Sequence, residues 1–127
     1  MRVGPRVLVL DDDHGILALL RNYFAGLGWH VEACAEADAG LQIADSDAPF
    51  DAVICDLHFT GAHLGEGFEI LSRARRRRPH SAVLLFTGAA GVGVREEALR
   101  HGADEVITKP APLGRLRDAA LRAMKKP

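Results

Sequence analysis

The chain has 127 residues, of which 48% are hydrophobic and 26% are charged, and its formal net charge is −1. This length suits one domain with a single core, and the near-neutral charge excludes a general attraction to nucleic acid or to an anionic membrane. The sequence contains no apolar signal core and no apolar run of about 18 residues, the length that a membrane-spanning helix needs. We therefore expect a soluble, cytoplasmic protein that forms one domain over residues 1–127.

Short apolar runs alternate with amphipathic segments along the whole chain. The apolar runs are brief and bounded by turn residues, which is typical of strands. They lie at residues 6–10, 29–34, 51–55, 82–86 and 104–108. The amphipathic segments have apolar side chains at helical spacing. They lie at residues 14–25, 36–44, 68–77, 94–100 and 112–124. Five alternations of strand and helix imply a parallel sheet with helices on both faces.

Polar residues follow four of the five predicted strands. Asp11 and Asp12 follow the first strand, and Asp56 follows the third. Thr87 follows the fourth strand, and Lys109 follows the fifth. Right-handed crossovers bring the C-terminal ends of parallel strands to one edge, where open α/β sheets carry their chemistry. The acids converge if the first and third strands are neighbours. We therefore predict a doubly wound, flavodoxin-like α/β fold with five helices and five parallel strands in the order 2-1-3-4-5.

Three carboxylates at one switch point indicate a cation and a phosphate group. Carboxylates within a few ångströms of one another repel, and each raises the pKa of the others. Mg²⁺ removes that conflict, because it binds a few carboxylates together with water and phosphoryl oxygens. Thr87 can donate a hydrogen bond to a phosphoryl oxygen, and Lys109 can pair with its charge. An aspartate can itself be the nucleophile and become an aspartyl phosphate.

These motifs, taken together and in order, resemble the receiver domain of two-component response regulators. Each of the matching pieces lies at a strand end, and the resemblance covers nearly the whole chain. The pieces are Val9-Leu10-Asp11-Asp12-Asp13, Asp51 through Asp56-Leu57, Phe86-Thr87-Gly88, and Gly102-Ala103-Asp104 leading to Lys109-Pro110.

The resemblance implies a role for each matching residue. Asp56 would be the phosphoacceptor, and Thr87 and Lys109 would contact the phosphoryl group. Mg²⁺ would be held by Asp11, Asp12, Asp56 and the backbone carbonyl of His58. The phosphoryl group would come from a sensor histidine kinase or a histidine phosphotransfer protein. The domain would act as a signalling switch and would catalyse only its own phosphorylation and dephosphorylation.

The sequence departs from the family pattern in the loop after Asp56 and at the positions that usually transmit the signal to partners. Thr60 stands where the family usually has proline, and Gly67 lies later after Asp56 than usual, so the loop 57–67 has an insertion of about three residues. Val106 replaces the family's switch aromatic, and Ala111 replaces the aromatic that often follows Lys-Pro. The usual rearrangement of threonine and aromatic is therefore not expected, and output would use another surface, such as this loop or Gly88–Gly93.

Several other polar residues have structural interpretations. Asp13 is predicted to cap a helix N-terminus, and Asp51 to be a solvated strand start. The four consecutive arginines Arg75–Arg78 are predicted to be solvated cations at a helix C-terminus. Cys34 and Cys55 have no disulfide or metal-ligand spacing and are predicted to be buried free thiols.

Two other functions are alternatives to the phosphorylated switch. A receiver fold that docks partners without obligatory phosphorylation would account for Val106 and the extended loop. A small Mg²⁺-dependent phosphatase with an aspartyl intermediate would normally carry Asp-x-Asp after a strand. Here Asp56-Leu57-His58 lacks the second aspartate, which argues against the phosphatase.

Overall fold

The computed structural model describes residues 4–57, 65–88 and 91–124. Within them lies a five-stranded parallel sheet in the order β2-β1-β3-β4-β5, which confirms the predicted fold. The strands are β1 (Arg6–Leu10), β2 (His30–Cys34), β3 (Ala52–Cys55), β4 (Ala82–Thr87) and β5 (Glu105–Thr108). The helices are α1 (His14–Gly26), α2 (Ala37–Ala44), α3 (Gly65–Arg77), α4 (Val92–Arg100) and α5 (Leu113–Met124). The model has no helix in its described part that is long and apolar enough to cross a membrane.

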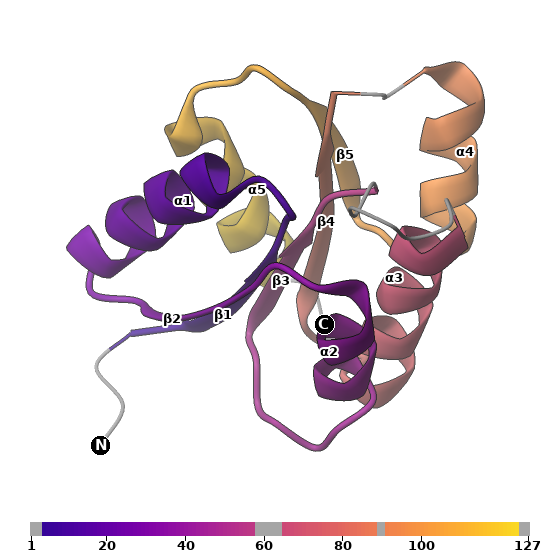
Figure 1. Cartoon of the computed structure of the whole chain (residues 1–127), viewed down its shortest axis with the longest axis horizontal. Helices are drawn as coiled ribbons and strands as arrows, with labels where there is room; N and C mark the ends of the chain where they lie inside the picture. Colours follow the sequence, from indigo (N-terminus) through magenta and orange to yellow (C-terminus); the bar gives the residue numbers. More distant parts are fainter. Residues whose placement is uncertain (1–3, 58–64, 89–90, 125–127) are drawn as a thin grey trace.

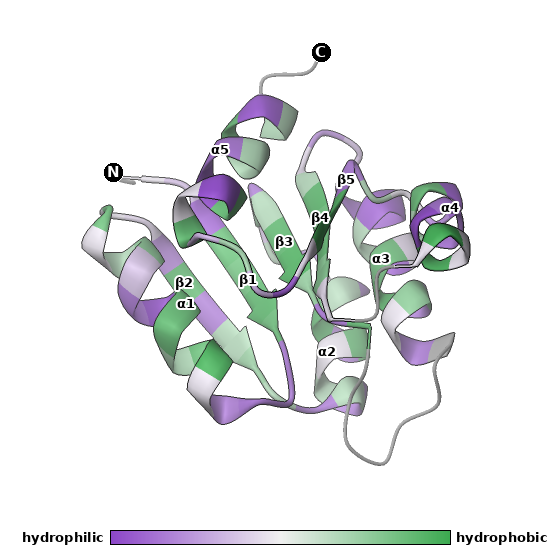
Figure 2. Ribbon diagram, turned by 90° about the horizontal axis from the view of Figure 1, so that it is seen from above, coloured by the Kyte–Doolittle hydropathy of each residue, from purple (hydrophilic) through white to green (hydrophobic). Residues whose placement is uncertain are grey.

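The sheet is covered on both faces, as the alternation of elements predicts. Helices α1 and α5 pack on one face, and α2, α3 and α4 pack on the other (Figure 1). One core therefore forms around Phe24 and Leu116, and a second around Ile70 and Leu71. The central strands β3 and β4 are buried along their whole length, whereas β2, an outermost strand, alternates between exposed and partly buried residues before the buried Cys34. The hydropathy of the strands follows their burial: in Figure 2 the inner strand β1 is mostly green, whereas the outermost strand β2 is partly purple.

Most element boundaries lie within two residues of their predicted positions, and the largest difference is at α3. This helix begins at Gly65, before the first apolar residue of its periodic pattern at Phe68. Gly67, in the added first turn, packs closely, because an added Cβ would come within 2.5 Å of the carbonyl oxygen of Leu57. A glycine is needed there because any side chain would collide with backbone.

The prediction that Arg75–Arg78 are solvated is wrong for Arg78. This side chain is buried, and its guanidinium lies 5.3 Å from the centre of the Phe50 ring. It donates hydrogen bonds to four backbone carbonyls at and beyond the end of α2, those of Ile43, Ala44, Ser46 and Ala48. Arg78 therefore supplies the donors that a helix C-terminus lacks.

Arg75 is half-buried and is bound by groups from distant parts of the chain. Its Nη2 lies 2.7 Å from Oδ2 of Asp104, and its Nε donates to the carbonyl of Gly102. Its Nη1 donates to the carbonyls of Pro79 and Ser81. Arg75 thus joins the C-terminal part of α3 to the turn before β5.

The remaining structural predictions have mixed outcomes. Asp13 caps α1 as predicted, because its Oδ1 accepts from the backbone N–H groups of Gly15 and Ile16. Cys34 and Cys55 are buried free thiols, also as predicted. Asp51 is not merely solvated: its Oδ2 accepts from the N–H of Arg6 at 2.8 Å, which joins the starts of β1 and β3.

Candidate functional site

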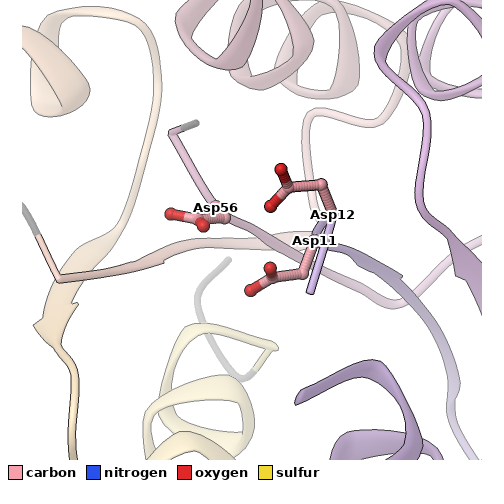
Figure 3. A group of neighbouring side chains, drawn as sticks. All are labelled: Asp11, Asp12 and Asp56. Carbon is pink, nitrogen blue, oxygen red and sulfur yellow. The ribbon is translucent and has the colours of Figure 1, made fainter. Parts of the chain in front are cut away.

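Three carboxylates meet at the C-terminal edge of the sheet. Asp11 and Asp56 each continue the ladder beyond their strands, because Asp11 donates its N–H to Cys34 and Asp56 donates its N–H to Leu10. Asp11 and Asp56 are buried and Asp12 is half-buried. Their carboxylates point into the same space (Figure 3), and one oxygen from each lies within 4.8 Å of the others. These residues could hold a metal ion, as the sequence predicts.

Lys109 is drawn into this acidic cluster. Its Nζ lies 2.6 Å from Oδ2 of Asp11 and 3.2 Å from Oδ2 of Asp56. The lysine follows β5, and its backbone N–H donates to the carbonyl of Thr87. The ammonium group therefore neutralises part of the charge that two adjacent carboxylates create.

Backbone groups hold the other oxygens of the two buried acids. Oδ1 of Asp11 accepts from the N–H of Asp13 at 2.9 Å, and Oδ1 of Asp56 accepts from the N–H of Leu57 at 2.7 Å. Each carboxylate is thereby fixed in orientation, with Oδ2 directed toward Lys109. The two Oδ2 atoms therefore face the same side of the cluster.

Burial and pairing act in opposite directions on the charges of this site. Burial raises the pKa of Asp11 above its usual range, and the hydrogen bond from Lys109 offsets only part of that rise. Burial also disfavours the charged form of Lys109, but the hydrogen bond and charge of Asp11, together with Asp56, raise its pKa overall. Lys109 is thus held as a cation, and the acidic cluster already attracts positive charge.

The structure describes Thr87 and Val106, but not His58 or Thr60. Thr87 ends β4 at the same sheet edge and is fully buried, and it pairs in register with Thr108. His58, whose carbonyl the resemblance assigns to the metal, lies outside the described residues, as does Thr60. Val106 is buried in the core beneath this edge, so the position of the family's switch aromatic is filled by an aliphatic side chain.

Two features beside Lys109 are not apparent from the sequence. The first is the ring of Phe86, whose centre lies 5.4 Å from Nζ of Lys109. The second is an apolar groove of about 190 Å³ between α1 and the segment that follows β5. Its lining residues are Ile16, Leu19, Leu20, Phe86, Lys109, Pro110, Ala111 and Leu113. The sequence places Phe86 directly before Thr87, but it does not show that the ring lies beside Lys109.

Comparison with known proteins identifies the family. A model of the response regulator receiver domain matches residues 7–121. The chain belongs to this family. The receiver domain is 34% identical over 97% of its length to the transcriptional regulatory protein TcrA of Mycobacterium tuberculosis. It is 30% identical over 91% of its length to the photosynthetic apparatus regulatory protein RegA of Rhodobacter capsulatus. The chain spans 47% of TcrA and 60% of RegA.

Solved structures agree with this assignment. A CheY-like receiver domain protein from Methanospirillum hungatei JF-1 is 27% identical with a TM-score of 0.82, covering 95% of this chain and 97% of that one. A receiver domain protein from Clostridium thermocellum is also 27% identical, with a TM-score of 0.81 and coverages of 95% and 94%. The chain is therefore a receiver domain of two-component signalling. Domains of this family interact with histidine kinases or phosphotransfer proteins and are generally not enzymes.

Proposed function

We propose that this receiver domain, residues 1–127, accepts a phosphoryl group on Asp56 with the help of Mg²⁺ and acts as a signalling switch. The observation that supports this most is the convergence of Asp11, Asp12 and Asp56 on one space, with Lys109 within 3.2 Å of both buried acids. Phosphoryl transfer depends chiefly on positioning and on neutralising charge. The site offers a fixed nucleophile, a cation and a cluster of oxygen ligands together.

The chemistry at Asp56 follows from its hydrogen bonds. The N–H of Leu57 holds Oδ1, and Oδ2, which faces Lys109, is the oxygen that attacks phosphorus. The new O–P bond forms as the P–N bond of a phosphohistidine breaks, and the histidine leaves as neutral imidazole because its other ring nitrogen already carries a proton. Lys109 hydrogen-bonds to the incoming phosphoryl group, and Thr87 donates its hydroxyl hydrogen to the same group.

The acidic cluster fits a hard divalent cation in its donor set. Asp11, Asp12 and Asp56 would hold Mg²⁺, together with the backbone carbonyl of His58, and the ion would neutralise phosphoryl oxygens. Without the ion, three carboxylates would repel the negatively charged phosphoryl group, and only one ammonium group would attract it. Removal of the metal should therefore prevent the reaction.

This dependence gives the first test. Intact mass should show a gain of one phosphoryl group when the chain is incubated with acetyl phosphate and Mg²⁺. Excess EDTA should abolish the gain, and added Mg²⁺ should restore it. Equal gain with and without the chelator would contradict the role of the metal, and no gain from either acetyl phosphate or a phosphorylated histidine phosphotransfer domain would contradict the proposed function.

The apolar groove supports a histidine-bearing partner beside the site. The groove is lined by α1 residues and by Lys109, which also contacts Asp56, so an occupant of the groove lies next to the phosphoacceptor. Leu19 lines it with 60% of its surface exposed. We propose that the helix carrying the phosphohistidine of a kinase or phosphotransfer protein packs here, because transfer needs that residue beside Asp56.

Leu19→Glu separates docking from chemistry. The added charge should lower labelling by a phosphorylated histidine phosphotransfer domain by about tenfold or more, because a carboxylate would be buried against apolar surface. Labelling by acetyl phosphate should stay within about twofold of wild type. Leu99→Glu is the matched control, since Leu99 is an exposed leucine on α4, on the opposite face of the sheet. Equal loss in both variants would contradict the assignment of this groove.

A further inference from the structure

The ammonium group of Lys109 has a third neighbour besides its two carboxylates. A lysine ammonium has three N–H groups, and here two of them are directed at Oδ2 of Asp11 and Oδ2 of Asp56. The ring of Phe86 lies beside the same nitrogen, with its centre 5.4 Å away. This separation is within the range of about 6 Å over which an aromatic face attracts a cation.

The ring of Phe86 is fixed by burial, so it can orient the more flexible side chain of Lys109. It lies on β4, directly before Thr87, and only 5% of its surface is exposed. Its ring packs in the core shared with α1 and α5, among residues such as Leu20 and Leu116. Lys109, in contrast, has a flexible four-carbon stem whose head is not fixed by covalent structure.

The chemistry of the ring suits this position. A carboxylate or amide there would compete with Asp11 and Asp56 for the ammonium. An aliphatic side chain would leave one side of a half-buried charge without a favourable neighbour. An aromatic face attracts the charge without taking an N–H from the carboxylates.

We propose that Phe86 is a positioning residue for Lys109, holding its ammonium group over Asp11 and Asp56 so that it meets the phosphoryl group. This inference rests on the proposed function for its effect on rate, but the contact itself does not depend on phosphorylation. Phe86 also lines the apolar groove in which we propose that the partner helix packs, and its ring therefore adjoins both this groove and Lys109. No atom of Phe86 takes part in bond making or breaking.

The test compares Phe86→Leu with Phe86→Tyr. The first removes the aromatic face and keeps an apolar side chain, and the second keeps the face. Leu84→Val is the matched control, because Leu84 is buried in the same core two residues earlier on the same strand, where it pairs with Glu105 on β5. Two quantities are measured: the NMR shift of the Lys109 ε-methylene protons, and the initial rate of Asp56 labelling by acetyl phosphate with Mg²⁺.

The ring should shift the ε-methylene resonance upfield in wild type and in Phe86→Tyr, and this shift should disappear in Phe86→Leu. Labelling should slow by about threefold to tenfold in Phe86→Leu and stay within about twofold of wild type in Phe86→Tyr and Leu84→Val. An unchanged resonance in Phe86→Leu, or equal slowing in Leu84→Val, would overturn the proposal. If wild type takes up no phosphate, the proposed function fails, and the resonance alone decides the role of Phe86.

Discussion

Asp56→Asn is expected to reduce phosphoryl labelling of the chain by more than about 100-fold, because an amide oxygen is a far weaker nucleophile than a carboxylate. The substitution keeps the size of the side chain and retains an oxygen that accepts from the N–H of Leu57. The fold should therefore be intact, and the loss should be chemical. Intact mass after incubation with acetyl phosphate and Mg²⁺ measures it directly.

Asp51→Asn is the matched control for this variant. Asp51 directly precedes β3, whereas Asp56 follows it, so the control changes an aspartate at the opposite edge of the sheet. Its amide oxygen can still accept from the N–H of Arg6, and labelling should equal that of wild type. Undiminished labelling of Asp56→Asn would refute Asp56 as the phosphoacceptor. If wild type were not labelled by any donor, the domain would be better explained as a docking module that works without phosphorylation.

Arg78→Met is expected to lower the free energy of unfolding by about 3 kcal/mol. The methionine can fill part of the volume over Phe50, but it has no donors for the four carbonyls that Arg78 binds at the end of α2. Each polar group left unsatisfied in a buried site costs roughly 1–3 kcal/mol, and water can satisfy some of these four. A loss of this size is a large fraction of the roughly 5–15 kcal/mol typical of a domain.

Urea unfolding followed by the fluorescence of Trp29 measures this loss. Trp29 is the one tryptophan of the chain and is buried in the core, so its emission reports global unfolding. Arg76→Met is the matched control, because Arg76 belongs to the same arginine run and is exposed. It should change the free energy of unfolding by less than about 0.5 kcal/mol. Equal midpoints for the two variants would show that Arg78 is no more important than a surface arginine.

The order of the elements and the edge at which the acids meet could be predicted from the sequence. Apolar periodicity is a local property, and a strand buried on both faces or an amphipathic helix is visible in a short window. Asp11, Asp12 and Asp56 could be placed together because parallel strands with right-handed crossovers leave little choice of topology. The cap at Asp13 also depends on its nearest neighbours alone, and it was predicted correctly.

The partners of the long charged side chains could not be predicted, because they come from distant parts of the chain. Arg78 binds carbonyls 30 to 35 residues away, and Lys109 reaches Asp11 across 98 residues. A run of arginines after a helix is typical of a solvated end, and no local pattern distinguishes the buried Arg78 from the exposed Arg76. The ring beside Lys109 depends in the same way on the pairing of β4 with β5. Such contacts depend on how distant segments pack, because a flexible charged side chain takes the acceptors that folding brings within its reach.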